Sequence, residues 1–202
     1  MTTPHNTPQD TPQSPLLEVL QLGNPKLRET ARAIASVDDP ALQSLIDQLL
    51  VTMHESNGVG IAAPQVGQPI CLLIVASRPN PRYPNAPEME PLPMLNPRLL
   101  SHSDETVKGW EGCLSVPGIR GLVPRYREIE VEYGDRHGNT HRRVFIDFVA
   151  RIVQHEADHL NGLVFVDRVE TTRDLITEQE YQKLLDAPQG GKGQDSEINT
   201  GA

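Results

Sequence analysis

The sequence predicts an α+β fold in which antiparallel or mixed β-sheets pack around a central helix. The helix is indicated by apolar and histidine side chains that recur on one helical face, at Phe148, Ile152, His155 and His159. A hairpin is indicated by residues 128–133, which alternate apolar and polar side chains, and by residues 140–146, which return after a DRHGN turn. Residues 71–76 form a continuous apolar run that is typical of a buried strand.

The 202-residue chain is long enough for a single domain with a sizeable core, which we place at residues 16–186. Hydrophobic residues make up 37% and aromatic residues 4%, which fits a globular centre with polar ends. Residues 1–15 carry four prolines among Thr, Gln and Asn, and residues 187–202 are rich in Gly, Gln and Ser. Neither composition can bury a core, so both tails are expected to be disordered.

Charge and cysteine content exclude several classes of protein. The formal net charge is -9 and no cluster of Lys and Arg is present, which argues against direct binding of RNA or DNA. Two cysteines are too few for a disulfide framework, so a reduced, cytoplasmic setting is expected. No apolar run is long enough to span a bilayer, and the N-terminus lacks the pattern of a signal peptide.

Two further helices are expected to flank the central one. Asp39-Pro40 supplies a cap and a favoured first residue for a helix over residues 40–56 in the N-terminal region. Its apolar face is formed by Leu42, Leu45, Ile46, Leu49, Leu50 and Met53. A capping box at residues 177–180 opens a short C-terminal helix that runs to about Leu185. The apolar residues 163–166 are expected to form a short strand before it.

Glycine and proline mark the remaining segments. Residues 58–67 hold three glycines and are expected to form a tight turn under the sheet that presents Gln65. The spacing of these glycines departs from the dinucleotide-binding fingerprint at Ala63. Residues 78–93 are rich in proline and are expected to form an exposed loop, after which residues 95–97 resume a strand and turn.

The central helix carries the pattern H-E-x-x-H at His155, Glu156 and His159. Residues four apart lie on one face of a helix, so the two histidines could hold one divalent metal ion. Glu156 could then handle the proton of a water molecule that the metal acidifies. The same residues also fit a buried amphipathic helix that carries two histidines without a metal, so a third ligand has to be found.

The third ligand of such a site would have to come from one of three parts of the chain. One class of zinc peptidase has a third histidine where this chain has Phe165, which cannot bind a metal. Another class uses a downstream glutamate, for which Glu178 and Glu180 are candidates, although both lie in the capping turn of a separate helix. Cys113 lies in residues 110–118, where glycine and proline predict an irregular backbone that could aim a thiolate at a metal. The alternative for Cys113 is an ordinary structural cysteine.

Residues 58–65, 111–115 and 154–159 form three motifs, by which the chain resembles the peptide deformylase family. The family has three ordered motifs, G-φ-G-φ-A-A-x-Q, E-G-C-L-S and Q-H-E-x-D-H. They are matched by residues 58–65, 111–115 and 154–159, in the same order. The resemblance extends from about Leu16 to Val169.

The resemblance implies a chemical role for each matched residue. Cys113, His155 and His159 would bind one divalent metal ion, usually Fe(II) in this family, with zinc, nickel or cobalt able to replace it. The metal-bound water would attack the formyl group of formyl-methionyl nascent polypeptides and release formate, with Glu156 as general base and then general acid. The oxyanion would be held by the metal and by two donors, the Leu114 backbone N–H and the Gln65 amide.

The resemblance also implies a substrate site. The Gly60 backbone would contact the substrate main chain, and the methionine side chain would enter an apolar pocket lined by Val59, Phe148 and Ile152. Two alternatives remain: a general metallopeptidase, and a non-catalytic relative that only binds peptides and would be expected to have lost Glu156 or a ligand.

Three features depart from the commonest pattern of the family. Asp147 stands where members often have glycine, so the start of the helix is expected to differ. The proline-rich residues 78–93 indicate a local insertion. Some members dock on the ribosome through a basic C-terminal helix, whereas Lys183 is the one basic residue of the helix expected here.

Overall fold

The computed structural model describes residues 16–80, 83 and 85–186, so the two predicted disordered tails lie outside it. The first sheet is ordered β1-β2-β3-β6-β7, from the strands Gly60–Ala62, Leu72–Ser77, Met89–His102, Glu128–Gly134 and Thr140–Ile146. The second sheet is ordered β4-β5-β8, from the strands Thr106–Cys113, Val116–Tyr126 and Leu175–Thr177. The α-helices are α1 (Pro40–Glu55), α2 (Asp147–Leu160) and α3 (Glu178–Asp186). All pairings between these strands are antiparallel.

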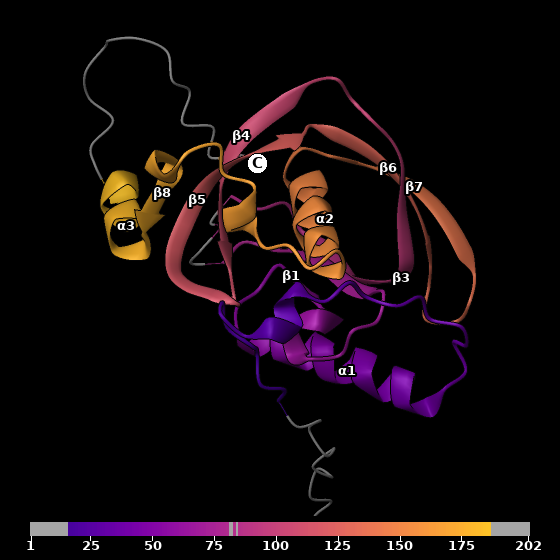
Figure 1. The fold of residues 1–202 in the computed structure, drawn as a ribbon. Coiled ribbons are helices and arrows are strands. Elements are labelled where there is room, and N and C mark those ends of the chain that lie inside the picture. Colours follow the sequence, from indigo (N-terminus) through magenta and orange to yellow (C-terminus); the bar gives the residue numbers. More distant parts are fainter. Residues whose placement is uncertain (1–15, 81–82, 84, 187–202) are drawn as a thin grey trace, which may run out of the picture.

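Helix α2 lies in the space enclosed by the two sheets (Figure 1). One face of β2 packs towards α2 through Leu73 and Val75, and the other packs towards α1 through Leu72 and Ile74. The strand is therefore buried on both faces, which explains why its sequence is a continuous apolar run. The α+β prediction with antiparallel sheets and three helices is confirmed, and α1 ends one residue earlier than predicted.

The helix termini follow from local hydrogen bonds. The Asp39 side chain accepts a hydrogen bond from Ala41 N at 2.9 Å, as a helix cap does. The predicted cap of α3 is also present, because Glu180 N donates to Thr177 Oγ1 at 3.3 Å. Helix α2 begins at Asp147 with a φ of 49°, a left-handed conformation that glycine adopts most easily. Arg127 holds this carboxylate, with Nε 3.0 Å from Oδ1.

The prediction of a loop over residues 78–93 is wrong at its end, because β3 already begins at Met89. Up to Leu95 this strand pairs with β2, and from Leu95 onwards it pairs with β6. Within the described residues, each half therefore has one side without a partner strand, where the missing N–H of a proline costs no ladder hydrogen bond. The change of partner coincides with Asn96, whose φ is 49°.

Three other segments also differ from prediction. Residues 60–62 form the edge strand β1, and a 3₁₀ helix over Ala63–Val66 follows in place of a simple turn. Residues 110–118 are largely regular, because β4 and β5 form a hairpin that turns at Leu114 and Ser115. The run 163–166 is not a strand, since a 3₁₀ helix begins at Phe165.

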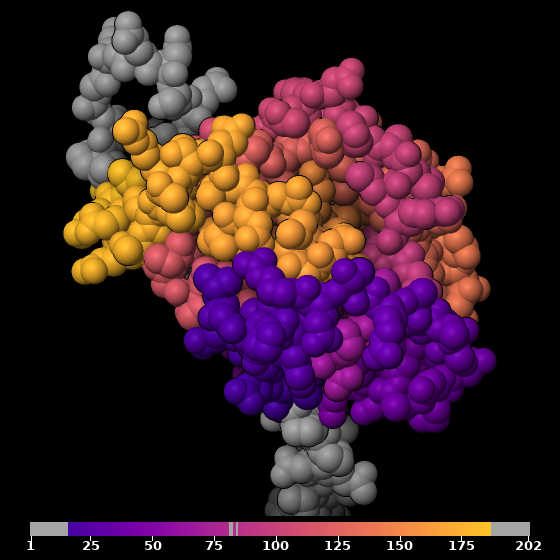
Figure 2. Space-filling model, viewed as in Figure 1, coloured from indigo at the N-terminus to yellow at the C-terminus, as the bar shows by residue number. Residues whose placement is uncertain are grey.

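The N-terminal segment covers the end of α2, and Figure 2 shows it in indigo beside the orange segment that follows this helix. Ala31 N donates to Leu160 O at 2.8 Å, and Arg28 pairs with Asp167. These contacts close the lower side of the space that holds α2. Within the described residues, no helix has both the length and the apolar character needed to cross a membrane.

Candidate metal centre

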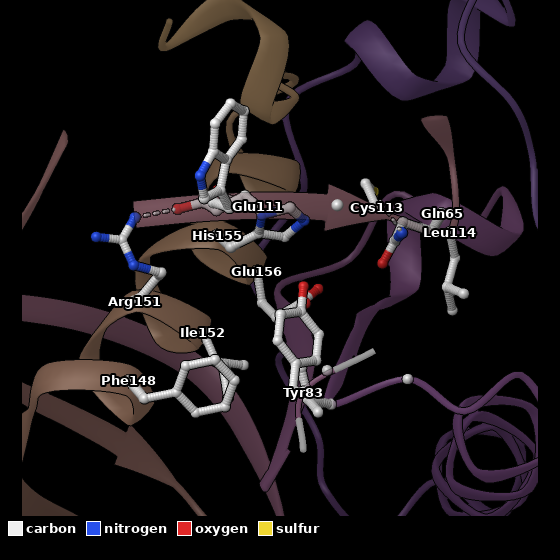
Figure 3. Close-up of a pocket in the computed structure, with 15 residues that line it drawn as sticks. Gln65, Tyr83, Glu111, Cys113, Leu114, Phe148, Arg151, Ile152, His155 and Glu156 are labelled. Carbon is white, nitrogen blue, oxygen red and sulfur yellow. Dashed lines mark hydrogen bonds and ion pairs between the residues drawn. The ribbon is translucent and has the colours of Figure 1, made fainter. Parts of the chain in front are cut away.

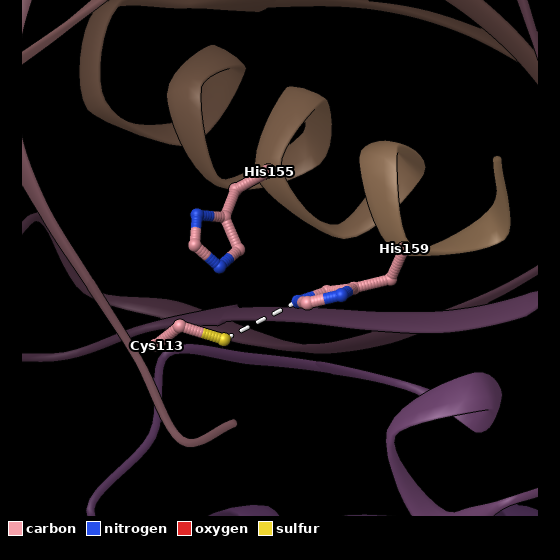
Figure 4. Close-up of side chains that lie close together, drawn as sticks. All are labelled: Cys113, His155 and His159. Carbon is pink, nitrogen blue, oxygen red and sulfur yellow. Dashed lines mark hydrogen bonds between the residues drawn. The ribbon is translucent and has the colours of Figure 1, made fainter. Parts of the chain in front are cut away.

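Cys113, His155 and His159 meet in the interior of the fold (Figure 4). One ligand atom from each residue lies within 4.8 Å of the others, and Cys113 Sγ is 3.3 Å from His159 Nε2. Cys113 ends β4, and the two histidines lie one turn apart on α2. A thiolate with two imidazoles is a donor set that suits a borderline divalent ion and leaves a coordination position open. The three residues therefore fit a metal ion.

Several groups favour the thiolate form of Cys113. Its Sγ accepts hydrogen bonds from Ser115 N at 3.3 Å and from Gln65 Nε2 at 3.4 Å. Burial alone would raise the pKa of the thiol, but His159 and His155 hold this pKa well below its ordinary value. A metal-binding cysteine has to be deprotonated, so this environment suits a ligand.

Glu111 orients the first histidine. His155 donates through Nδ1 to Glu111 Oε2 at 2.8 Å, which leaves Nε2 free to face a metal. Burial alone would lower the pKa of His155, but Cys113 and Glu111 raise it well above the ordinary value. Burial would likewise raise the pKa of Glu111, whereas Arg125 and His155 hold it well below its usual range.

Glu111 belongs to a buried network of charges that was not predicted from the sequence. Arg125 binds Glu111 in a bidentate manner at 2.9 and 3.0 Å, and its Nη1 is 2.7 Å from Asp158 Oδ2. Arg168 also reaches Asp158, and Arg151 Nη1 is 2.9 Å from Glu111 Oε1. The signal in the sequence was that Glu111 and Asp158 lie inside the matched motifs although neither was assigned a role.

Glu156 is 4% exposed and lines the same pocket as the candidate ligands Cys113 and His155. Its Oε2 has no hydrogen-bond partner among the described residues. Burial raises the pKa of this carboxyl to about 7, so near neutral pH it can both accept and release a proton. Gly60 makes room for it, because a Cβ at that position would lie 2.4 Å from Glu156 Oε1.

A pocket opens next to these residues (Figure 3). It is lined by nearly all of the predicted site residues, namely Val59, Gly60, Gln65, Cys113, Leu114, Phe148, Ile152, His155 and Glu156. His159 does not line it and lies behind, 1% exposed. The other lining residues were not predicted as site residues, and those with large side chains are Tyr83, Trp110, Glu111 and Arg151.

The orientation of the Gln65 amide is fixed by its neighbours. Its Oε1 accepts from Ala62 N at 2.8 Å, and its Nε2 donates to Ser115 Oγ at 3.1 Å. The amide nitrogen therefore faces the end of β4, where Leu114 lies at the turn of the hairpin. Figure 3 shows Gln65 and Leu114 on the same side of the pocket, across from Phe148 and Ile152.

The other candidate ligands lie elsewhere. Glu178 binds Arg120, with Oε2 2.6 Å from Nε, and Glu180 pairs with Lys183 at 2.6 Å. Phe165 is buried with its ring 6.2 Å from that of His155. Among the described residues, the ligand cluster consists of Cys113 and the two histidines.

The chain matches the family model for polypeptide deformylase over residues 16–174. It is 61% identical over 170 residues to peptide deformylase 2 of Nostoc sp., which covers 84% of this chain and 95% of that protein. It is 44% identical over 167 residues to peptide deformylase 1 of Bordetella pertussis, with 83% and 93% of the two chains covered.

Solved structures agree with these sequence matches. A class I type b peptide deformylase from Acinetobacter baumannii, in its Met-Ala-Ser-bound crystal structure, superposes with a TM-score of 0.76. The two chains are 48% identical, and the match covers 77% of this chain and 99% of the other. The peptide deformylase of Thermotoga maritima matches with a TM-score of 0.69 at 32% identity, over 77% and 99% of the two chains.

Proposed function

We propose a role for each residue of the site, on the basis that the chain belongs to the peptide deformylase family. It is thus a metal-dependent hydrolase that removes the N-formyl group from the N-terminal methionine of new proteins. Cys113, His155 and His159 hold the divalent metal ion. The observation that carries this proposal is that their donor atoms lie within 4.8 Å of one another. When bound, the ion supplies Lewis acidity that makes water more acidic and a carbonyl more electrophilic.

Glu156 is the proton carrier of the reaction. Its carboxylate takes a proton from the attacking water and passes it to the nitrogen that leaves from the formyl carbon. The pKa of about 7, raised by burial, supports both halves of this transfer at neutral pH. Gly60 has no side chain to displace the carboxylate from this position.

Gln65 and Leu114 stabilise the negative charge that develops on the formyl oxygen. The Gln65 amide is held by Ala62 and Ser115, so its nitrogen is oriented before the substrate arrives. The backbone N–H of Leu114 is the second donor, at the turn of the β4–β5 hairpin. Donors fixed in advance need no rearrangement during the reaction, and one such donor is worth about 3 kcal/mol of barrier.

The pocket beside Glu156 receives the methionine side chain. Val59, Phe148 and Ile152 give it apolar walls, and the Gly60 backbone pairs with the main chain of the peptide. The Met-Ala-Ser peptide bound to the Acinetobacter baumannii relative supports a methionyl peptide as the occupant.

We further propose Fe(II) as the resident metal, with zinc, nickel or cobalt able to replace it, because one thiolate and two imidazoles suit such borderline ions. The enzyme would work in the cytoplasm, where its substrates emerge from the ribosome. Docking on the ribosome would need a surface other than a basic α3, since Lys183 is the one basic residue of that helix.

One assay tests the proposed function against its alternatives. Metal-loaded protein is incubated with a formyl-methionyl peptide and, separately, with an unmodified protein, and both formate and new amines are measured. Formate with an equal amount of new amine is the expected result. Internal cleavage of the unmodified protein without formate would identify a general metallopeptidase, and no reaction with either substrate would identify a peptide-binding relative.

A further inference from the structure

The pocket wall is connected to the C-terminal helix through two aromatic rings. Trp110 lines the pocket, and its ring centroid lies 5.6 Å from that of Tyr181 on α3, with an interplanar angle of 54°. Tyr181 is the buried residue of this short helix. Helix α3 follows residue 174, where the match to the family model ends. A part of the chain outside that match therefore supports a residue of the substrate site.

A buried arginine stands beside Tyr181. Arg120 on β5 is 0% exposed, and Glu178 of α3 binds its Nε and Nη2 at 2.6 and 3.1 Å. Its guanidinium lies 4.8 Å from the centre of the Tyr181 ring and 5.2 Å from that of the Tyr83 ring. These contacts offset part of the cost of burying the charge, and through them Arg120 links both rings to β5.

The second ring held by Arg120 also belongs to the pocket. Tyr83 lines it, and its ring centroid is 5.2 Å from that of Phe148, at an interplanar angle of 57°. Figure 3 shows the Tyr83 ring in front of Glu156, near Phe148 and Ile152. Two aromatic residues of the pocket wall, Tyr83 and Trp110, thus pack against one connected group of side chains, which we call the support. That support consists of Arg120, Tyr181 and Glu178, two of which lie on α3.

We propose that Tyr181 is a positioning residue for the substrate pocket. Its ring holds Trp110 against the methionyl end of the bound peptide. This inference rests on the proposed function and adds α3 to the structure that determines substrate affinity. Aromatic walls suit a methionine side chain, because a thioether makes favourable contacts with aromatic rings. Tyr181 does not touch the metal ligands or Glu156, so its loss weakens peptide binding and leaves the chemical step nearly unchanged.

The test uses Trp110 as a built-in probe, because it is the one tryptophan of the chain. Full-length Tyr181→Ala is compared with Tyr181→Phe, which keeps the ring, and with Leu184→Ala. Leu184 lies on the same helix and is 50% exposed, so its removal controls for a general disturbance of α3. Tryptophan emission is recorded without and with a methionyl tripeptide, and kcat and KM are measured with a formyl-methionyl tripeptide.

We expect a red-shifted Trp110 emission in Tyr181→Ala and a KM raised about two- to tenfold, the loss expected for one aromatic pair, with kcat within about twofold. Tyr181→Phe and Leu184→Ala should match the wild type in both measurements. If Tyr181→Ala equals Leu184→Ala in emission and in KM, or if kcat falls while KM stays unchanged, the positioning role is overturned.

The test gives an answer even if Tyr181→Ala does not fold or the wild type does not release formate. Should Tyr181→Ala fail to fold, Tyr181→Leu retains apolar bulk without the ring and carries the same expectations. Failure of the proposed function would show as a wild-type protein that releases no formate. The emission comparison does not depend on turnover, so it still decides whether Tyr181 sets the surroundings of Trp110.

Discussion

His155 donates a hydrogen bond through Nδ1 to Oε2 of Glu111 across 2.8 Å, although the two residues lie on different layers of the fold. The strand β4 supplies the carboxylate and α2 supplies the imidazole. Because Glu111 is in turn held by Arg125 and Arg151, the imidazole cannot turn away without breaking a buried ion network. The orientation of one proposed metal ligand is thus set by residues outside the ligand cluster.

Glu111→Gln is expected to weaken metal binding about 10- to 100-fold, because an amide holds the imidazole less firmly than a carboxylate. The measurement is a competition titration with a metal chelator. Glu105→Gln is the matched control, since Glu105 lies on an exposed ion pair with Arg127. Equal metal affinity in the two variants would show that Glu111 does not support the site.

Cys113→Ser is expected to lower the metal content of the dialysed protein sharply, because a hydroxyl is a poor ligand for a borderline ion. Cys71→Ser is the control, because it changes the other cysteine of the chain. The Cys71 thiol lies outside the site and donates to Ala31 O. Elemental analysis after dialysis measures the effect. Full metal occupancy in Cys113→Ser would remove this residue from the ligand set.

Glu156→Gln is expected to keep its metal and to lose turnover by about 10²- to 10⁴-fold, the usual contribution of a general base. The three ligands are untouched by this change, whereas the group that accepts the proton is gone. Formate release and metal content are measured on the same preparation. Turnover near the wild-type rate would mean that another group carries the proton.

Gly60→Ala is expected to reduce turnover at least tenfold while the metal content stays unchanged. The new Cβ would lie 2.4 Å from Glu156 Oε1, so the carboxylate has to leave its position. Gly134→Ala is the control, because its nearest neighbour would be 3.6 Å from the new Cβ. If both variants keep full activity, the closeness of Gly60 to Glu156 has no catalytic role.

The ion pair between Asp167 and Arg28 is expected to contribute less to the free energy of unfolding in acid. Partial burial opposes ionisation of Asp167, but the hydrogen bond from Arg28 lowers its pKa below the ordinary value. A lowered folded-state pKa gives stability that is present above the unfolded pKa of about 3.9 and is lost as the pH falls through the folded value. Because both side chains are partly exposed, this stability is about 0.5–1 kcal/mol.

Asp167→Asn should therefore be less stable than the wild type at pH 7, and the difference should shrink as the pH approaches 3. Urea unfolding at several pH values measures it. Asp104→Asn is the control, because Asp104 is exposed and makes no ion pair within the described residues. A difference that stays constant with pH would assign the effect to something other than the charge of Asp167.

The elements predicted correctly are those whose sequence pattern matches their burial. Helix α1 has one apolar face on the sheet, and strand β6 of the β6–β7 hairpin alternates buried side chains with partly or fully exposed ones. Strand β3 was missed at its start because Pro91 and Pro93 predict a loop, and the free side of the strand that tolerates them is a property of the sheet. The run 163–166 is too short for periodicity to distinguish a strand from a helical turn.

The clustering of Cys113, His155 and His159 beside Glu156 could be predicted, because the histidine pattern is local in the sequence and Cys113 belongs to a motif shared with a family. The supporting residues could not, since an arginine on a strand gives no sign of its partner. Arg125 and Arg120 lie five residues apart on β5, yet one binds Glu111 and the other binds Glu178. These pairings depend on how β5 packs against its neighbours in the folded protein, which the sequence alone does not give. The contact between Tyr181 and Trp110 depends in the same way on how α3 packs against β4.

The proposed ligand set takes its sulfur from the β4–β5 hairpin and both nitrogens from α2. An ion bound by these three residues would link the smaller sheet to the helix, in addition to its proposed part in the reaction. Oxidation of the Cys113 sulfur would then break this link and stop the reaction in one event. Loss of activity in air and a looser association of the smaller sheet with the rest of the domain are therefore expected to develop together.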